Sequence, residues 1–242
     1  MSVAKLAEPL LSLFFPPVCS ICGEKFESGE ERICDDCRQE AEKIGLLICH
    51  VCGAEIGRRS RRRCPKCPEG EVYFDKARSG YLYFGRLREA IHLFKYGQYR
   101  ELGRELGRMM LVGLSDFSAE THPEEKADFL LPVPMHIWRR LYRGYNHSEV
   151  LAQILAEASG LPCLPGALIR HRHTTRQALL PHEKRLSNIR GAFTVPDSNL
   201  VRDKHIALVD DIMTSGSTVN ECARSLREKG AREITVYTLA RA

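Results

Sequence analysis

One stretch near the carboxyl end decides the fold of this chain: Ile206-Ala207-Leu208-Val209-Asp210-Asp211-Ile212-Met213-Thr214-Ser215-Gly216-Ser217-Thr218. Its apolar first half predicts a buried strand that delivers two adjacent acids to its carboxyl end. The small, hydroxyl-rich loop that follows opens directly into a predicted helix, so its N–H groups and hydroxyls can face a phosphate. The two carboxylates would repel a phosphate, but they can accept hydrogen bonds from a diol. The stretch therefore predicts a site for a ribose 5-phosphate; the alternative is a strand–turn–helix that binds no ligand.

The segments around this stretch alternate between helix and strand patterns. Helices are predicted over 85–97, 148–159 and 218–229, strands over 129–134, 205–209 and 234–239, and a polar loop over 115–126. Strands that alternate with helices form a parallel α/β sheet, which binds ligands at the carboxyl ends of its strands. We therefore expect a domain over 78–242 with the acids and the loop at one edge of its sheet.

The amino-terminal part has a different chemistry, because eight of the ten cysteines lie between residues 19 and 67. They form four C-x-x-C pairs that start 15 residues apart: Cys19/Cys22, Cys34/Cys37, Cys49/Cys52 and Cys64/Cys67. Two such pairs supply four thiolates, which suits tetrahedral zinc. We predict two closed, structural zinc sites in a zinc-ribbon module over 10–70. Sequential sets of four are the simplest assignment, and an interleaved arrangement would use the same residues.

Other interpretations of the cysteines fit the sequence less well. A disulfide framework needs an oxidising compartment, iron–sulfur sites group three cysteines more closely, and a redox C-x-x-C normally occurs once. The run Arg58-Arg59-Ser60-Arg61-Arg62-Arg63 lies between the last two pairs. It is either a phosphate-contacting loop or a solvated loop whose charge offsets the thiolates.

Charge and hydropathy point to an ordinary soluble protein. The formal net charge is +5, and eight thiolates on two zinc ions would lower it to about +1, so overall charge does not indicate nucleic-acid binding. No apolar run approaches the roughly 18–20 residues of a membrane helix, and none has the pattern of a signal peptide. We expect a cytoplasmic protein without a membrane span.

The stretch quoted first resembles the phosphoribosyl pyrophosphate (PRPP) motif of type I phosphoribosyltransferases. The resemblance implies a type I phosphoribosyltransferase-like parallel sheet flanked by helices, in which Asp210 and Asp211 hold the ribose. It assigns the 5-phosphate to the loop residues Thr214, Ser215, Gly216, Ser217 and Thr218. Purine salvage members often carry an acid at the first loop position, where this chain has Thr214, so the resemblance does not support a purine acceptor.

The whole chain, over roughly 10–242, resembles the ComF competence-protein family. The resemblance rests on Phe15-Pro16-Pro17-Val18-Cys19-Ser20-Ile21-Cys22-Gly23, Phe94-Lys95-Tyr96, Arg143-Gly144-Tyr145-Asn146-His147, and Arg170-His171-Arg172-His173-Thr174-Thr175-Arg176-Gln177 with Arg185, Asn188 and Phe193. Tyr145 and His147 depart from the R-G-F-N-Q segment of the family. In family members the region corresponding to 170–190 is a hood that closes over the substrate. The resemblance thus implies diphosphate contacts by Arg143 and Arg176, with Mg²⁺ bridging diphosphate and ribose oxygens.

Two functions are consistent with these features. The first is a PRPP-binding protein of the ComF type that acts in DNA uptake during natural transformation, with single-stranded DNA and a competence helicase as expected partners. The second is a metabolic phosphoribosyltransferase that transfers ribose 5-phosphate from PRPP to an unidentified, non-purine acceptor. No general base stands out in the sequence, so catalysis stays open, whereas PRPP binding is common to both.

Overall fold

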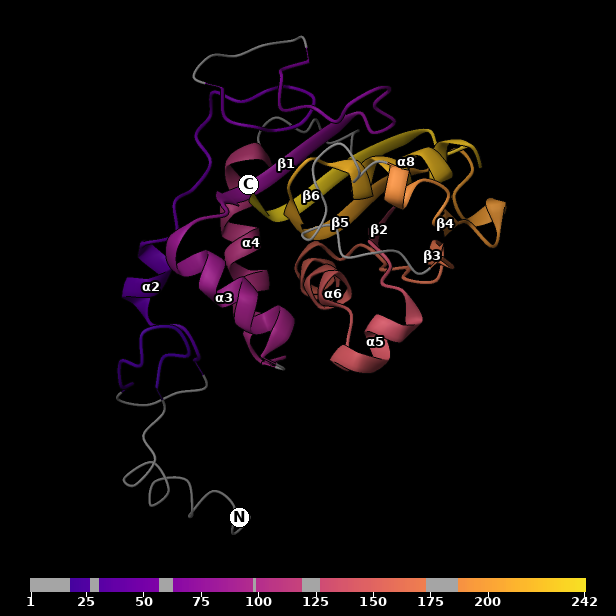
Figure 1. The fold of residues 1–242 in the computed structure, drawn as a ribbon. Helices are drawn as coiled ribbons and strands as arrows, with labels where there is room; N and C mark the ends of the chain where they lie inside the picture. Colours follow the sequence, from indigo (N-terminus) through magenta and orange to yellow (C-terminus); the bar gives the residue numbers. More distant parts are fainter. Residues whose placement is uncertain (1–17, 27–30, 57–62, 98, 119–126, 173–186) are drawn as a thin grey trace.

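A parallel four-stranded sheet forms the centre of the protein (Figure 1). The computed structural model describes residues 18–26, 31–56, 63–97, 99–118, 127–172 and 187–242. The sheet has the order β1-β6-β5-β2, with every neighbouring pair parallel. A separate antiparallel pair is formed by β3 and β4. Because all four strands of the main sheet run the same way, their carboxyl ends meet at one edge.

The predicted helices and strands are present, and β5 continues past its predicted end at Val209 to Met213, so both acids lie within the strand. In chain order the helices and strands are α2 (Asp35–Gln39), β1 (Lys76–Leu82), α3 (Gly85–Tyr96), α4 (Leu102–Ser118), β2 (Phe129–Pro132), α5 (Ile137–Arg143), α6 (His147–Ser159), β3 (Ile169–Arg170), β4 (Phe193–Thr194), the 3-10 turn η3 (Ser198–Leu200), β5 (His205–Met213), α8 (Ser217–Arg227) and β6 (Glu233–Arg241). The loop predicted over 115–126 was wrong at its start, because α4 continues to Ser118 on its apolar face, where Phe117 is buried.

Both faces of the sheet are covered, and the two cysteine-rich halves lie on different faces. Ile206 and Leu208 of β5 belong to a core that includes Val219 of α8 and the buried Cys49 and Cys52. The alternate residues Ala207 and Val209 face a second core, built on α3, α4 and α6, which also includes Cys19, Cys34 and Cys37. This period of two explains why residues 206–209 of β5 are all apolar: a central parallel strand is buried on both sides.

Strand β1 carries no apolar run, and the sequence did not predict it. Its residues Arg78 and Ser79 are both buried, and tertiary contacts satisfy them. The Arg78 guanidinium donates to the carbonyl of His50 at 3.0 Å, and Ser79 Oγ is hydrogen-bonded to Thr238 Oγ1 at 2.6 Å. Burial of polar groups with partners costs little, so the strand can sit in the sheet without a hydrophobic pattern.

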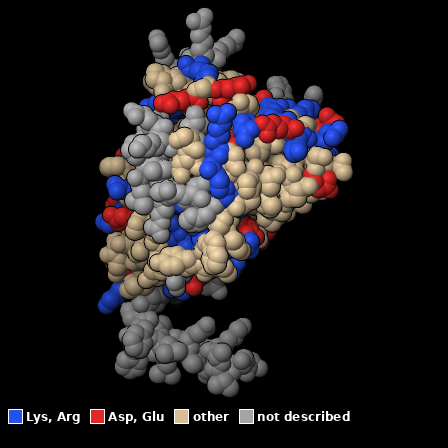
Figure 2. Space-filling view, turned by 45° about the vertical axis from the view of Figure 1, so that its right-hand side comes forward, with Lys and Arg blue, Asp and Glu red and all other residues tan. Residues whose placement is uncertain are grey.

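The surface carries both signs of charge. Figure 2 shows one face on which Lys and Arg side chains form a vertical band, with acidic side chains near its upper end. Among the described residues, no helix combines the length and apolarity needed to cross a bilayer.

Candidate functional site

The eight cysteines gather into two tetrads, and each tetrad is sequential. The sets are Cys19, Cys22, Cys34 and Cys37, and Cys49, Cys52, Cys64 and Cys67, with all ligand atoms of a set within 4.8 Å of one another. The sulfur–sulfur distances include 3.8 and 3.6 Å in the first set and 3.7 and 3.5 Å in the second. A tetrahedron with Zn–S bonds of about 2.3 Å has edges of about 3.8 Å, so both sets fit zinc. The interleaved arrangement is thereby ruled out, and four thiolates leave no open position for a substrate.

Both tetrads begin with the same tight turn. The backbone N–H of Gly23 donates to the carbonyl of Cys19, and that of Gly53 donates to the carbonyl of Cys49, each at 2.9 Å. Both glycines are left-handed, with φ of +77° and +65°. A side chain would strain this conformation, which is why glycine follows the first C-x-x-C pair of each half.

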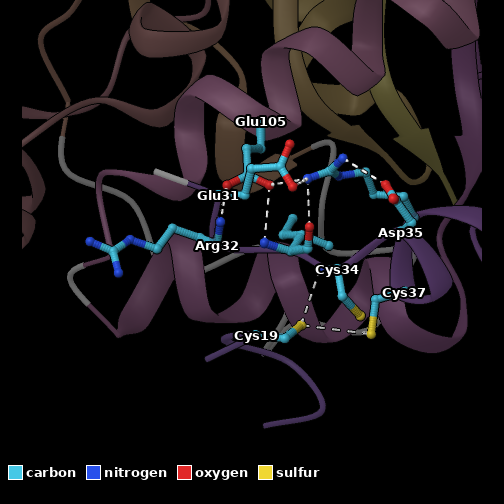
Figure 3. Close-up of polar contacts among 9 residues, drawn as sticks. Cys19, Glu31, Arg32, Cys34, Asp35, Cys37 and Glu105 are labelled. Carbon is cyan, nitrogen blue, oxygen red and sulfur yellow. Dashed lines mark hydrogen bonds and ion pairs between the residues drawn. The ribbon is translucent and has the colours of Figure 1, made fainter. Parts of the chain in front are cut away.

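The first tetrad is attached to α4 through one carboxylate (Figure 3). Glu105 is buried and accepts hydrogen bonds from the backbone N–H groups of Arg32 and of Ile33, the latter at 3.0 Å. The guanidinium of Arg38 lies 3.2 Å from the same carboxylate and also pairs with Asp35 at 3.0 Å. The chain between the two C-x-x-C pairs is therefore held to the helix layer by charge-assisted hydrogen bonds.

The predicted phosphate loop lies at the carboxyl end of β5. Gly216 adopts a left-handed conformation with φ of +75° and immediately precedes α8. The Ser215 and Ser217 hydroxyls are 2.9 Å apart, and the backbone N–H of Ser217 donates to Ser215 Oγ at 3.4 Å. An open hollow is lined by Asp210, Ile212, Met213, Thr214, Ser215, Gly216, Ser217, Thr218 and Val219. The structure thus brings one acid and all five predicted loop residues around one space.

The two acids contact different side chains, one from α6 and one from α3. Asp210 lines the hollow, and its Oδ1 accepts hydrogen bonds from Ser148 Oγ at 2.8 Å and from the backbone N–H of Asp211 at 2.9 Å. Asp211 is buried, and its Oδ1 lies 2.8 Å from Lys95 Nζ. The lysine therefore neutralises one acid of the pair.

Burial and mutual repulsion shape the charge of this site. Burial, reinforced by the neighbouring Asp211, raises the pKa of Asp210 to about 7. Burial works to lower the pKa of Lys95, but the attraction of Asp211 outweighs it and raises that pKa. At neutral pH the lysine is charged while Asp210 is close to its midpoint, so a hydroxyl donor or a cation that approaches Asp210 favours its ionised form.

Phe94, which precedes Lys95, belongs to a cluster of aromatic rings. The ring of Phe94 lies 5.5 Å from that of Tyr145 and 5.0 Å from that of His147, between centroids. The Tyr145 hydroxyl donates to the carbonyl of Phe94. Burial lowers the pKa of His147 to about 4, so its imidazole is neutral. The segments 94–96 and 143–147, distant in sequence, are thus packed together.

Three of the described arginines, Arg143, Arg170 and Arg172, have different environments. The Arg143 guanidinium carbon is 4.7 Å from the centroid of the Tyr96 ring, a cation–π contact. Partial burial and the nearby Arg139 lower the pKa of Arg170 to about 10. Arg172 donates to the carbonyls of Asn188 and Arg190. Arg176 lies outside the described residues, as do 173–186 of the expected hood and 57–62 of the arginine run.

Lys95 and Ser148 are site residues that sequence reasoning did not select. Lys95 was quoted only as part of a helix segment, yet it is the ion-pair partner of Asp211. Ser148 lies in the first turn of α6 and donates to Asp210. The available signal was weak: a lysine on the helix face occupied by Leu87, Ile91 and Phe94 would be costly unless an acid met it.

The comparisons with known proteins cover nearly the whole chain. Residues 10–68 match the double zinc ribbon domain, and residues 142–242 match the phosphoribosyl transferase domain. The chain is 31% identical over 230 residues to competence protein F of Haemophilus influenzae, covering 95% of this chain and 99% of that protein. It is 28% identical over 229 residues to the DNA utilization protein YhgH of Escherichia coli K12, with the same coverage. It is 27% identical over 248 residues to competence protein ComFC of Bacillus subtilis, covering 93% and 95%.

These findings confirm the expected architecture, a phosphoribosyltransferase-like parallel sheet with helices on its faces and an amino-terminal zinc-ribbon region. The two domains occur in the order that the sequence resemblance implied. With a relative above 30% identity that aligns almost end to end, the chain belongs to the competence protein F, or ComF, family.

Proposed function

We propose that this protein binds PRPP at the carboxyl end of β5 and acts in the handling of DNA during natural transformation. The observation that carries the PRPP site is the hollow in which Asp210 and the loop 214–218 meet in front of α8. The role in DNA uptake is supported by the relatives, which are competence proteins and a DNA utilization protein.

The loop suits the 5-phosphate for a physical reason. The left-handed Gly216 turns the chain so that the N–H groups of the first turn of α8 face the hollow, and an anion there benefits from the helix dipole. The hydroxyls of Ser215 and Ser217 already bond to each other and can rotate to donate to phosphate oxygens. Gly216 is left-handed, with φ of +75°, so any residue with a Cβ would be strained at this position of the loop.

The acids suit the ribose in two different ways. In this proposal Asp210 accepts a ribose hydroxyl directly, because it lines the hollow and its pKa near 7 allows ionisation when a donor arrives. Asp211 completes the ribose side and fixes Lys95 beside it, so that the substrate meets a site with little net repulsion. Ser148 orients the Asp210 carboxylate through its 2.8 Å hydrogen bond.

The basic residues suit the diphosphate. Arg139 and Arg170 are neighbouring cations, and their repulsion contributes to the lowered pKa of Arg170. An anion between or beside them would relieve that cost. We assign Arg143, and Arg176 of the undescribed segment, to the same group. Mg²⁺ enters the proposal as the counter-ion of the diphosphate, and no residue is assigned to it.

The alternative function is phosphoribosyl transfer to a non-purine acceptor. It uses the same PRPP site and differs only in having an acceptor, for which no residue is identified. Single-stranded DNA and a competence helicase are proposed partners, and the cytoplasm is the proposed location, because handling of incoming single strands takes place there.

The test is calorimetric titration with PRPP, ribose 5-phosphate and a single-stranded oligonucleotide, each with and without Mg²⁺. We expect Mg²⁺-dependent PRPP binding that Asp210→Asn weakens by roughly tenfold, since a charge-assisted hydrogen bond is worth about 1.5 kcal/mol or more. Gly216→Val should abolish binding. The matched control is Gly160→Val, which replaces another left-handed glycine that closes α6 and has no atoms within 4 Å of the added carbon. Failure of the wild-type protein to bind PRPP would refute the proposal.

A further inference from the structure

The second zinc tetrad has surroundings unlike those of the first. The backbone N–H of Ala77 in β1 donates to the carbonyl of Val51 at 2.7 Å, between the cysteines of the third pair. A Cβ on Gly53 would lie 2.4 Å from the carbonyl oxygen of Ala77. The second ribbon is therefore packed directly on the edge strand of the sheet, whereas the first is attached to α4 through Glu105.

The last C-x-x-C pair continues into a residue that touches the phosphate loop. Pro68 follows Cys67 directly and is buried. A Cβ on Gly216 would lie 2.9 Å from Pro68 Cγ, so the proline ring packs against the glycine that caps α8. Arg63 holds this turn in place by donating to the carbonyls of Pro68 and Gly70. The ring therefore forms one wall beside the left-handed turn of the loop.

Arg241 connects the same tetrad to the strand that leads into the loop. It pairs in register with Met213, and the N–H of the next residue donates to the Met213 carbonyl at 3.1 Å. Its Nη2 lies 3.6 Å from Cys52 Sγ and donates to the carbonyl of Lys66 at 3.0 Å. Lys66 lies between the cysteines of the last pair. Arg241 thus connects the ligand Cys52 and the last C-x-x-C pair with the carboxyl end of β5.

The burial of Arg241 indicates what balances its charge. The residue is 4% exposed, and its Nε and Nη1 have no hydrogen-bond partner among the described residues. An uncompensated buried guanidinium is costly. Four thiolates on Zn²⁺ carry a net charge of about −2, so the loaded tetrad supplies the opposite charge next to this guanidinium.

The chain that follows the second tetrad is also tied to α8. The Asn220 side chain accepts from the backbone N–H of Tyr73 at 2.8 Å and donates to the carbonyl of Glu71 at 2.8 Å. Arg227 Nε donates to the carbonyl of Tyr73 at 3.1 Å. Residues 68–73 and the helix that presents the phosphate loop are therefore joined at several points.

We propose that the second zinc site is a structural part of the phosphate loop, with Arg241 and Pro68 as the positioning residues, and that the first zinc site is not. Metal in the second tetrad fixes the knuckle 64–67, which sets the Pro68 wall against Gly216 and anchors Arg241 beside Met213. The inference rests on the proposed PRPP function for its binding consequence. Its structural consequence, the order of residues 213–218, does not depend on any ligand.

The matched variants are Cys64→Ser and Cys34→Ser, which remove equivalent ligands from the second and first tetrads. Hydrogen exchange of 213–218 without ligand should be faster in Cys64→Ser and unchanged in Cys34→Ser. PRPP affinity should fall at least tenfold in Cys64→Ser only. Equal exchange in the two variants would overturn the inference, whether or not PRPP binds. Absence of PRPP binding by the wild type would overturn only the proposed function.

A second measurement separates positioning from general loss of structure. Cobalt replaces zinc in tetrathiolate sites and reports their geometry by its absorption. In Cys34→Ser protein loaded with cobalt, only the second tetrad is complete, and addition of PRPP should shift its spectrum. In Cys64→Ser protein the spectrum should not change.

Arg241→Met should weaken PRPP binding about tenfold while Arg241→Lys restores part of it, because the charge is kept. Unchanged affinity in Arg241→Met would contradict the role of this residue.

Discussion

Replacement of Asp210 by asparagine should stabilise the fold while it weakens ligand binding. Burial and Asp211 raise the pKa of Asp210 to about 7 from its ordinary value of 3.8. The native state therefore binds a proton more tightly than the unfolded state does. Stability is fully present below about pH 4 and is lost as the pH rises toward 7, because the carboxyl must ionise in a site that disfavours its charge. Asparagine removes that cost.

The magnitude follows from the pKa and from the two hydrogen bonds. A shift from 3.8 to about 7 corresponds to at most ~4 kcal/mol at pH 8, since one unit is worth 1.36 kcal/mol. The asparagine oxygen keeps weaker hydrogen bonds from Ser148 and the N–H of Asp211, at a loss of about 1 kcal/mol each. The net gain is about 2 kcal/mol, or a rise in melting temperature of roughly 4–8 °C for a chain of this size.

The assay is urea denaturation of wild type and Asp210→Asn from pH 4 to pH 8. The difference in unfolding free energy should be near zero or negative at pH 4, grow between pH 4 and 7, and then level off. Asp128→Asn is the control of opposite sign. Despite some burial, the N–H of His205 and the ammonium of Lys204 lower the pKa of Asp128, so its removal should destabilise the protein at neutral pH. A variant Asp210→Asn that is less stable than wild type at pH 8 would refute the account of the acid pair.

Three further outcomes are expected. Elemental analysis should find two zinc ions per chain, and one in Cys34→Ser; iron, or a metal-free protein with intact thiols, would contradict the tetrads. Lys95→Met should cost about 3 kcal/mol in urea denaturation because it leaves Asp211 buried without a partner, and adding Asp211→Asn should recover most of that loss; additive effects would show that the pair does not interact. Glu105→Gln should speed hydrogen exchange of 31–38 without affecting α8, because the carboxylate that holds the first ribbon loses its charge; unchanged exchange there would show that packing alone is sufficient.

Local patterns in the sequence were enough to predict the parts of the site that are contiguous. The order of strand, two acids, hydroxyl loop and helix is written in residues 206–218, and the fifteen-residue spacing of the cysteine pairs predicts the eight ligands of two zinc sites. That the two sets of four are sequential was decided by the structure. Such features depend on backbone geometry over a few residues, so periodicity and residue type report them directly. The family resemblance rests on the same kind of local segment.

The tertiary structure decided which distant residues meet. Lys95 reaches Asp211, and Ser148 reaches Asp210, because β5 is a central strand and α3 and α6 cover the face beside its carboxyl end. Arg241 reaches Cys52 only because β6 is inserted between β1 and β5, next to the edge on which the second ribbon packs. Strand order is not a local property: it is set by how helices and ribbon bury the two faces of the sheet, and a one-dimensional pattern does not contain that choice.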